Sequence, residues 1–96
     1  MILEFEWDKE KEITNLKKHG VSFDEAKSVF YDYLAKVAFD KEHSIKEERF
    51  NIIGFSKNNR ILHVTYTENY DVIRIISARK SSKTEKKIYE KSYKNN

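Results

Sequence analysis

The chain has 96 residues, a formal net charge of +3 and no cysteine. This length predicts a single domain over residues 1–96. Because there is no cysteine, the chain has no disulfide framework, no thiolate nucleophile and no cysteine zinc site. Because it contains no run of about 18 apolar residues and its first seven residues lack the basic start of a signal peptide, we expect a soluble, cytoplasmic protein with no membrane partner.

Two helices are predicted after a short strand at the start of the chain. Residues 3–7 alternate apolar and acidic side chains, which is typical of a half-buried strand. Asp8 is a suitable N-cap for a helix that runs to about residue 19, and Gly20 is placed to end it. Ser22 and Glu25 stand at capping-box spacing and predict the start of a second helix.

The middle of the chain predicts an antiparallel sheet. Four segments are rich in β-branched and aromatic residues: Leu34 to Phe39, Arg49 to Phe55, Arg60 to Thr67 and Val72 to Arg79. The connections between the last three are too short for crossover helices, so these strands should form a meander. The charged stretch Asp40 to Glu48 predicts an exposed loop. The expected fold class is α+β, with two N-terminal helices packed on an antiparallel meander and a C-terminal helix.

The register of the last hairpin decides which side chains share a face. A two-residue turn at Asn69 and Tyr70 would place Thr67 opposite Val72. The core face would then hold Leu62, Val64, Tyr66, Ile73 and Ile75. The open face would hold His63, Thr65, Thr67 and Arg74, with Glu68 and Arg79 near opposite strand ends. A three-residue turn would change this assignment, and the sequence leaves both open.

The end of the chain, about residues 82–96, is basic. Ser82 and Glu85 have capping-box spacing and predict a helix that runs to about Tyr93. From Arg79 onward there are seven Lys or Arg and two Glu, so this part has a net charge of +5 and the rest a net charge of −2. Such an end suits a polyanion, although a solvated helix is an equally good explanation of most single lysines.

Several enzyme classes lack their residues here. Two glycines cannot form a glycine-rich phosphate loop, so we expect no nucleotide cofactor. The three histidines have no i, i+4 spacing, and the carboxylates are scattered, which disfavours a zinc site or a two-metal nuclease site. The sequence therefore predicts no metal.

The remaining candidates for chemistry are arginines and histidines in or beside the predicted strands: His43, Arg49, His63, Arg74 and Arg79. A guanidinium held on a strand can offer a bidentate fork to a phosphate. RNA carries its own nucleophile, the 2′-OH, so positioning, charge stabilisation and proton transfer can suffice to cleave it. The alternative is that each arginine forms a rim ion pair and each histidine is a surface or capping residue.

Four separated motifs resemble the BrnT family in the same order: Phe5-Glu6-Trp7-Asp8, the stretch from Asn15 to Ala26, Glu47-Glu48-Arg49-Phe50 with Gly54, and the stretch from Arg74 to Arg79. The resemblance covers roughly residues 4 to 93. It implies a RelE-like fold and a metal-independent ribonuclease toxin that cleaves mRNA. It also implies a BrnA-like ribbon-helix-helix antitoxin, through which the complex binds operator DNA and represses the operon.

The residues and the resemblance together give a hypothesis for the site. The expected catalytic residues are His43, Arg49, Glu68, Arg74 and Arg79, and the expected RNA-binding residues are Lys18, His19, His63, Lys80 and Lys83. In this hypothesis Arg74 and Arg79 bind the scissile phosphate, Arg49 assists them, and His43 or Glu68 moves a proton. The alternative is a non-catalytic basic module that binds an acidic protein or nucleic acid.

Overall fold

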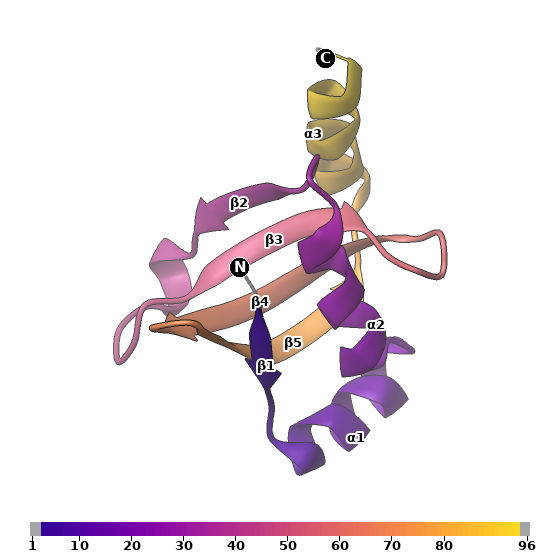
Figure 1. Ribbon diagram of the computed structural model, residues 1–96. Helices are drawn as coiled ribbons and strands as arrows, with labels where there is room; N and C mark the ends of the chain where they lie inside the picture. Colours follow the sequence, from indigo (N-terminus) through magenta and orange to yellow (C-terminus); the bar gives the residue numbers. More distant parts are fainter. Residues whose placement is uncertain (1–2, 95–96) are drawn as a thin grey trace.

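The computed structural model describes residues 3–94, with side chains as far as Lys91, and shows a twisted sheet with helices against it (Figure 1). The elements in chain order are β1 (Glu4–Glu6), α1 (Lys9–His19), α2 (Phe23–Ser28), the 3₁₀ turn η1 (Val29–Tyr31), β2 (Lys36–Phe39), the 3₁₀ turn η2 (Lys41–His43), β3 (Phe50–Phe55), β4 (Ile61–Asn69), β5 (Val72–Lys80) and α3 (Lys83–Lys94). The strand order across the sheet is β1-β5-β4-β3-β2.

The capping residues begin and end the first helices as the sequence predicts. The Asp8 carboxylate accepts hydrogen bonds from the backbone N–H groups of Glu10 and Lys11. Gly20 ends α1 in the left-handed conformation, with φ of 69°. The Ser22 hydroxyl accepts from the backbone N–H of Glu25 and starts α2. Local capping chemistry therefore sets these boundaries.

The sheet is mixed rather than wholly antiparallel. Strands β3 to β5 form the predicted antiparallel meander, and β2 adds a fourth antiparallel strand to it. However, β1 lies parallel to β5, with Phe5 beside Ile73. The expectation of an antiparallel sheet is therefore wrong at this edge. Phe5 has a physical reason to lie there, because its ring packs edge-on against Phe30, 5.2 Å between centroids, and extends the core.

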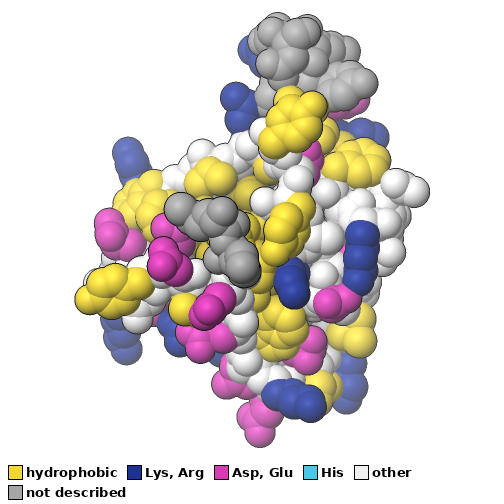
Figure 2. All heavy atoms as spheres, in the orientation of Figure 1, with side chains coloured by type: hydrophobic (Ala, Val, Ile, Leu, Met, Phe, Trp, Pro, Cys, Tyr) yellow, Lys and Arg dark blue, Asp and Glu magenta, His cyan; other side chains and the backbone are white. Residues whose placement is uncertain are grey.

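The core lies between one face of the sheet and the segment formed by α2 and η1. Phe23 and Val29 from that segment are fully buried, as are Leu62 and Val64 from β4. A Cβ on Gly54 of β3 would lie 2.9 Å from a methyl group of Val29, so glycine allows this close approach. Figure 2 shows the surface of the molecule on this side, where hydrophobic side chains extend from the upper into the central part.

The hairpin between β4 and β5 turns one residue later than predicted. Its two-residue turn is 70–71 rather than 69–70, so Thr67 pairs with Arg74 and not with Val72. The predicted turn is wrong, but the error does not change which side chains at this end of the hairpin share a face of the sheet. The pairing has shifted by two residues, and a shift by an even number keeps every side chain on its face.

A β-bulge in β5 has a larger effect. Tyr66 pairs with Ile75, but Thr65 pairs with Ser77, so Ile76 is an extra residue in β5. Strict alternation would place Arg79 on the core face with Ile75. The extra residue moves Ser77 and Arg79 to the opposite face. Arg79 therefore stands directly beside its Cα partner His63.

Candidate functional site

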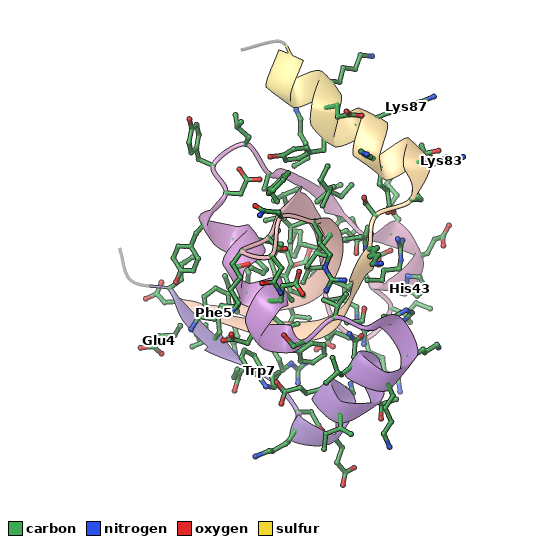
Figure 3. The ribbon with its side chains drawn as sticks, turned by 90° about the vertical axis from the view of Figure 1, so that its right-hand side faces the viewer. Glu4, Phe5, Trp7, His43, Lys83 and Lys87 are labelled. Atoms are coloured by element: carbon green, nitrogen blue, oxygen red, sulfur yellow. The ribbon has the colours of Figure 1, made fainter. Side chains whose placement is uncertain are left out.

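A hollow of about 770 Å³ opens on the sheet face away from α2. Four of the residues expected to form the site line it: His43 from η2, Arg49 just before β3, His63 from β4 and Arg79 from β5. In Figure 3, His43 lies between α1 and the start of α3, where Lys83 is labelled. The fold thus brings together side chains from four separate segments of the chain.

One carboxylate joins two of these groups. The two Glu85 oxygens accept hydrogen bonds from Arg79 Nη1 and Nη2 at 2.8 and 2.9 Å. The same carboxylate lies 3.6 Å from His63 Nε2 and also accepts from the backbone N–H of Ser82 at the start of α3. Glu85 therefore caps α3 and holds the planar guanidinium of Arg79 next to the imidazole of His63.

The surroundings shift the pKa values in this cluster. Burial alone would raise the pKa of Glu85, but hydrogen bonds from Arg79 and Ser82 and the charges of His63 and Arg79 outweigh it and lower the pKa to about 2. Burial lowers the pKa of His63, and the nearby Arg79 charge adds to this, while Glu85 opposes it. The lowered pKa favours the neutral form of the His63 imidazole, which is the form that can accept a proton.

His43 and Arg49 reach the hollow from its loop side. His43 Nδ1 lies 3.0 Å from a carboxylate oxygen of Asp40, and 64% of the His43 side chain is exposed. Arg49 Nη2 lies 3.4 Å from Glu47 Oε1, and Arg49 Nε is buried without a hydrogen-bond partner within the described range 3–94. Ser44 stabilises the loop between β2 and β3, because its hydroxyl accepts a hydrogen bond from the Arg49 backbone N–H.

Arg74 and Glu68 lie elsewhere. They line a separate hollow of about 350 Å³ together with Glu6, Glu47 and Glu48. Arg74 Nη2 donates to Glu47 Oε2 at 2.7 Å. The structure therefore does not bring Arg74 or Glu68 to the hollow that contains Arg79, and it surrounds Arg74 with carboxylates.

The expected RNA-binding residues divide in the same way. His63 lines the large hollow, and Lys18 and His19 line a neighbouring hollow against α1. Lys80 pairs with the core residue Leu62, so it lies on the opposite face of the sheet from Arg79. Lys83 is exposed at the first turn of α3.

Arg60, the fourth arginine, forms an ion pair that stabilises the fold and lines neither hollow. It donates through Nε to Glu25 Oε2 at 2.9 Å, and the Glu25 side chain is 2% exposed. The Ser56 hydroxyl donates to the same carboxylate at 2.7 Å. The hydrogen bonds from Arg60, with that from Ser56, lower the pKa of Glu25 against the effect of burial. This pair anchors α2 to the β3–β4 turn.

Sequence reasoning identified Glu85 only as a capping residue and gave Ser77, Asn51 and Thr65 no role. All but Glu85 line the large hollow, and the Thr65 hydroxyl donates to the Asn51 side-chain oxygen at 2.8 Å. The capping-box spacing was the one available signal for Glu85. Its contact with Arg79 depends on how α3 leaves the sheet, which the spacing does not determine.

A metal ion in a protein needs several His, Cys, Asp or Glu side chains close together. Across residues 3–94, no three His, Asp or Glu side chains are grouped so that they could hold a metal ion. Within the same range, no helix is long and apolar enough to cross a membrane.

An open hollow with two guanidinium and two imidazole groups on a small α+β domain is typical of a class of protein that binds phosphate-containing ligands at its surface. The family model described as "Ribonuclease toxin, BrnT, of type II toxin-antitoxin system" matches residues 7–85. The chain therefore belongs to the BrnT family of ribonuclease toxins of type II toxin–antitoxin systems. Such a toxin acts on RNA and has an antitoxin partner.

The chain is also similar to a solved structure of this family. It resembles the crystal structure of the ribonuclease toxin BrnT of Brucella abortus with a TM-score of 0.65 and 30% sequence identity, over 85% of this chain and all of that one. No curated protein matches the chain. The α+β fold of this chain is therefore similar to that of a solved BrnT toxin.

Proposed function

We propose that this toxin is a metal-independent endoribonuclease with a RelE-like fold whose reaction takes place in the hollow lined by His43, Arg49, His63 and Arg79. The observation that carries the proposal is the convergence of these two guanidinium and two imidazole groups from four segments on one open surface. The reaction needs no group beyond these, because RNA supplies its own nucleophile.

The chemical roles follow from the surroundings. His63, whose neutral form is favoured by burial, accepts the proton of the 2′-OH while the 2′ oxygen forms a bond to the adjacent phosphorus. Arg79, held flat by Glu85, and Arg49 stabilise the charge of the phosphorane. The bond from phosphorus to the 5′ oxygen breaks, and His43 donates the proton that this oxygen needs. The products are a 2′,3′-cyclic phosphate and a 5′-hydroxyl.

The sequence analysis expected Arg74 and Arg79 together to bind the scissile phosphate, and this assignment keeps Arg79 alone in that role. Arg74 shares its hollow with four carboxylates, which repel a phosphate. Glu68 lines that same hollow and not the one that contains Arg79. His63 replaces Glu68 as a proton acceptor in the proposal.

The test uses the purified chain with RNA in EDTA. The expected result is cleavage to fragments that end in 2′,3′-cyclic phosphate, and His63→Asn should reduce the rate about 100-fold, because general bases contribute roughly 10² to 10⁴. Glu90→Gln, on an exposed position of α3 outside both this hollow and the one that His19 lines, is the control. Cleavage that appears only when Mg²⁺ is added would overturn the mechanism.

The antitoxin in this proposal is a BrnA-like ribbon-helix-helix protein that covers the hollow and binds operator DNA, so that the complex represses its own operon. The sequence resemblance supports its class. Co-expression with the neighbouring reading frame should give a stable complex with little nuclease activity. A complex that cleaves RNA at the full rate would show that the antitoxin does not cover the hollow.

A non-catalytic binding module is the second candidate. It is favoured by the ion pairs, since Arg49, Arg60, Arg74 and Arg79 each contact a carboxylate. Growth arrest separates the two functions. If Arg79→Ala abolishes arrest while the variant still binds the antitoxin, the enzyme is supported, whereas unchanged arrest supports the binding module.

A further inference from the structure

A second hollow continues the proposed active site toward α1. It measures about 370 Å³, and it shares Ile76 and Ser77 with the large hollow. These are the residues at the β-bulge of β5. The two hollows therefore meet at the bulge and form one groove along the sheet face.

The wall of this second hollow is a single face of α1. Lys11, Thr14 and Lys18 line it, together with Asn15. Their spacing of three and four residues places them side by side on a helix. His19 and Glu10 complete the lining from the two ends of the helix.

Asn15 fixes the distance between this helix face and the sheet. Its Nδ2 donates to the Ala78 carbonyl at 2.8 Å and to the Val21 carbonyl at 3.0 Å, and its Oδ1 accepts from the Ala78 N–H at 3.1 Å. The side chain is buried and takes the place along β5 that β1 leaves after Arg74. The groove is thus a preformed feature of the fold, not a gap that can close.

The chemistry of the groove suits single-stranded RNA. Lys11 and Lys18 are exposed cations that can each pair with a backbone phosphate, while Thr14 offers a hydroxyl. Ile76 is half-buried and provides an apolar surface for a base at the junction of the hollows. Glu10 is the one carboxylate in the second hollow, and it stands at the opposite end of α1 from Lys18.

We propose that the groove between α1 and β5 is an RNA subsite that binds the nucleotides flanking the cleaved bond, with Lys11 and Lys18 holding their phosphates. This inference rests on the proposed function, because the large hollow must hold the scissile phosphate. It makes the preferred substrate a single strand of several nucleotides rather than a dinucleotide. The bulge at Ile76 is where the strand passes from one hollow to the other.

The test compares the double variant Lys11→Ala/Lys18→Ala with Lys9→Ala/Lys17→Ala. The control removes the same charge from the same helix, and its two lysines are exposed and outside the groove. Binding is measured with non-cleavable 2′-O-methyl RNA hexamers, and cleavage with mixed-sequence dinucleotides and hexamers.

The groove variant should bind the hexamer about tenfold more weakly than the control, with a salt dependence smaller by about 0.7 for each lost phosphate contact. Its cleavage of dinucleotides should stay within about twofold of the control. Equal hexamer binding by the two variants would overturn the subsite and leave the proposed function standing. A wild-type chain that binds the hexamer in a lysine-dependent way but cleaves no RNA would instead overturn the proposed function.

Discussion

Arg79 and Arg74 lie on the same strand and the same face of the sheet, yet their surroundings differ in charge. Arg79 shares the large hollow with Lys41, Arg49 and two histidines, which outweigh the carboxylates of Asp40 and Glu42, and Glu85 orients its guanidinium. Arg74 shares its smaller hollow with four glutamates. The comparison shows that a strand position does not make an arginine a phosphate ligand, because the neighbouring charges decide what can approach it.

Glu47 lies between these two regions. One of its oxygens contacts Arg49 and the other contacts Arg74. The carboxylate therefore marks the boundary where the cationic hollow ends and the acidic hollow begins. Substitutions in the two hollows should therefore have different effects on RNA cleavage.

The largest expected effect comes from removing Arg79. Arg79→Ala should lower kcat/KM for RNA cleavage by about 100-fold or more, since losing one preorganised donor to a developing charge costs roughly 10² to 10³. Arg74→Ala, the matched change in the acidic hollow, should stay within about threefold of wild type. Steady-state cleavage of a labelled RNA measures both. An equal or greater loss in Arg74→Ala would contradict the division into two hollows.

Glu85→Gln should act on both activity and stability. Misplacing Arg79 should cost about tenfold in cleavage rate, and the acid limb of the pH–rate profile should move to lower pH, because Glu85 raises the pKa of His63. Glu90→Gln, on an exposed position of α3, is the control. An unmoved acid limb would show that Glu85 does not act on the group that titrates.

The stability effect has a defined sign. The folded pKa of Glu85 is about 2, below its ordinary value of 4.5, so Glu85 stabilises the fold above pH 4.5 and loses this contribution as pH falls toward 2. Urea unfolding should show wild type more stable than Glu85→Gln by roughly 2 kcal/mol at pH 7, with a gap that narrows between pH 4.5 and 2. A gap that widens toward acid would contradict the assignment.

The smallest effect is expected from Glu47→Gln. Removing the boundary charge should strengthen binding of non-cleavable RNA about two- to threefold at low salt, and the gain should shrink as salt screens it. Glu48→Gln, which also lines the acidic hollow but has no arginine contact among the ion pairs found within residues 3–94, is the comparison. Weaker binding by Glu47→Gln alone would mean that Glu47 serves mainly to position Arg49.

The sequence by itself determined the features that depend on neighbouring residues. Asp8, Gly20 and Ser22 set helix boundaries through capping, and the short connections made the last strands antiparallel, because these effects act over a few residues. It also indicated which residue types could act on RNA, and four of them meet in one hollow.

Only the tertiary structure decided which of those residues lie together. The bulge at Ile76 moved Arg79 to the face of His63, and the path of α3 brought Glu85 between them. The same fold placed Arg74 among glutamates from three places: β1, β4 and the loop that precedes β3. Side-chain proximity between distant segments depends on strand register and on packing across the whole sheet, and no local pattern encodes either of them.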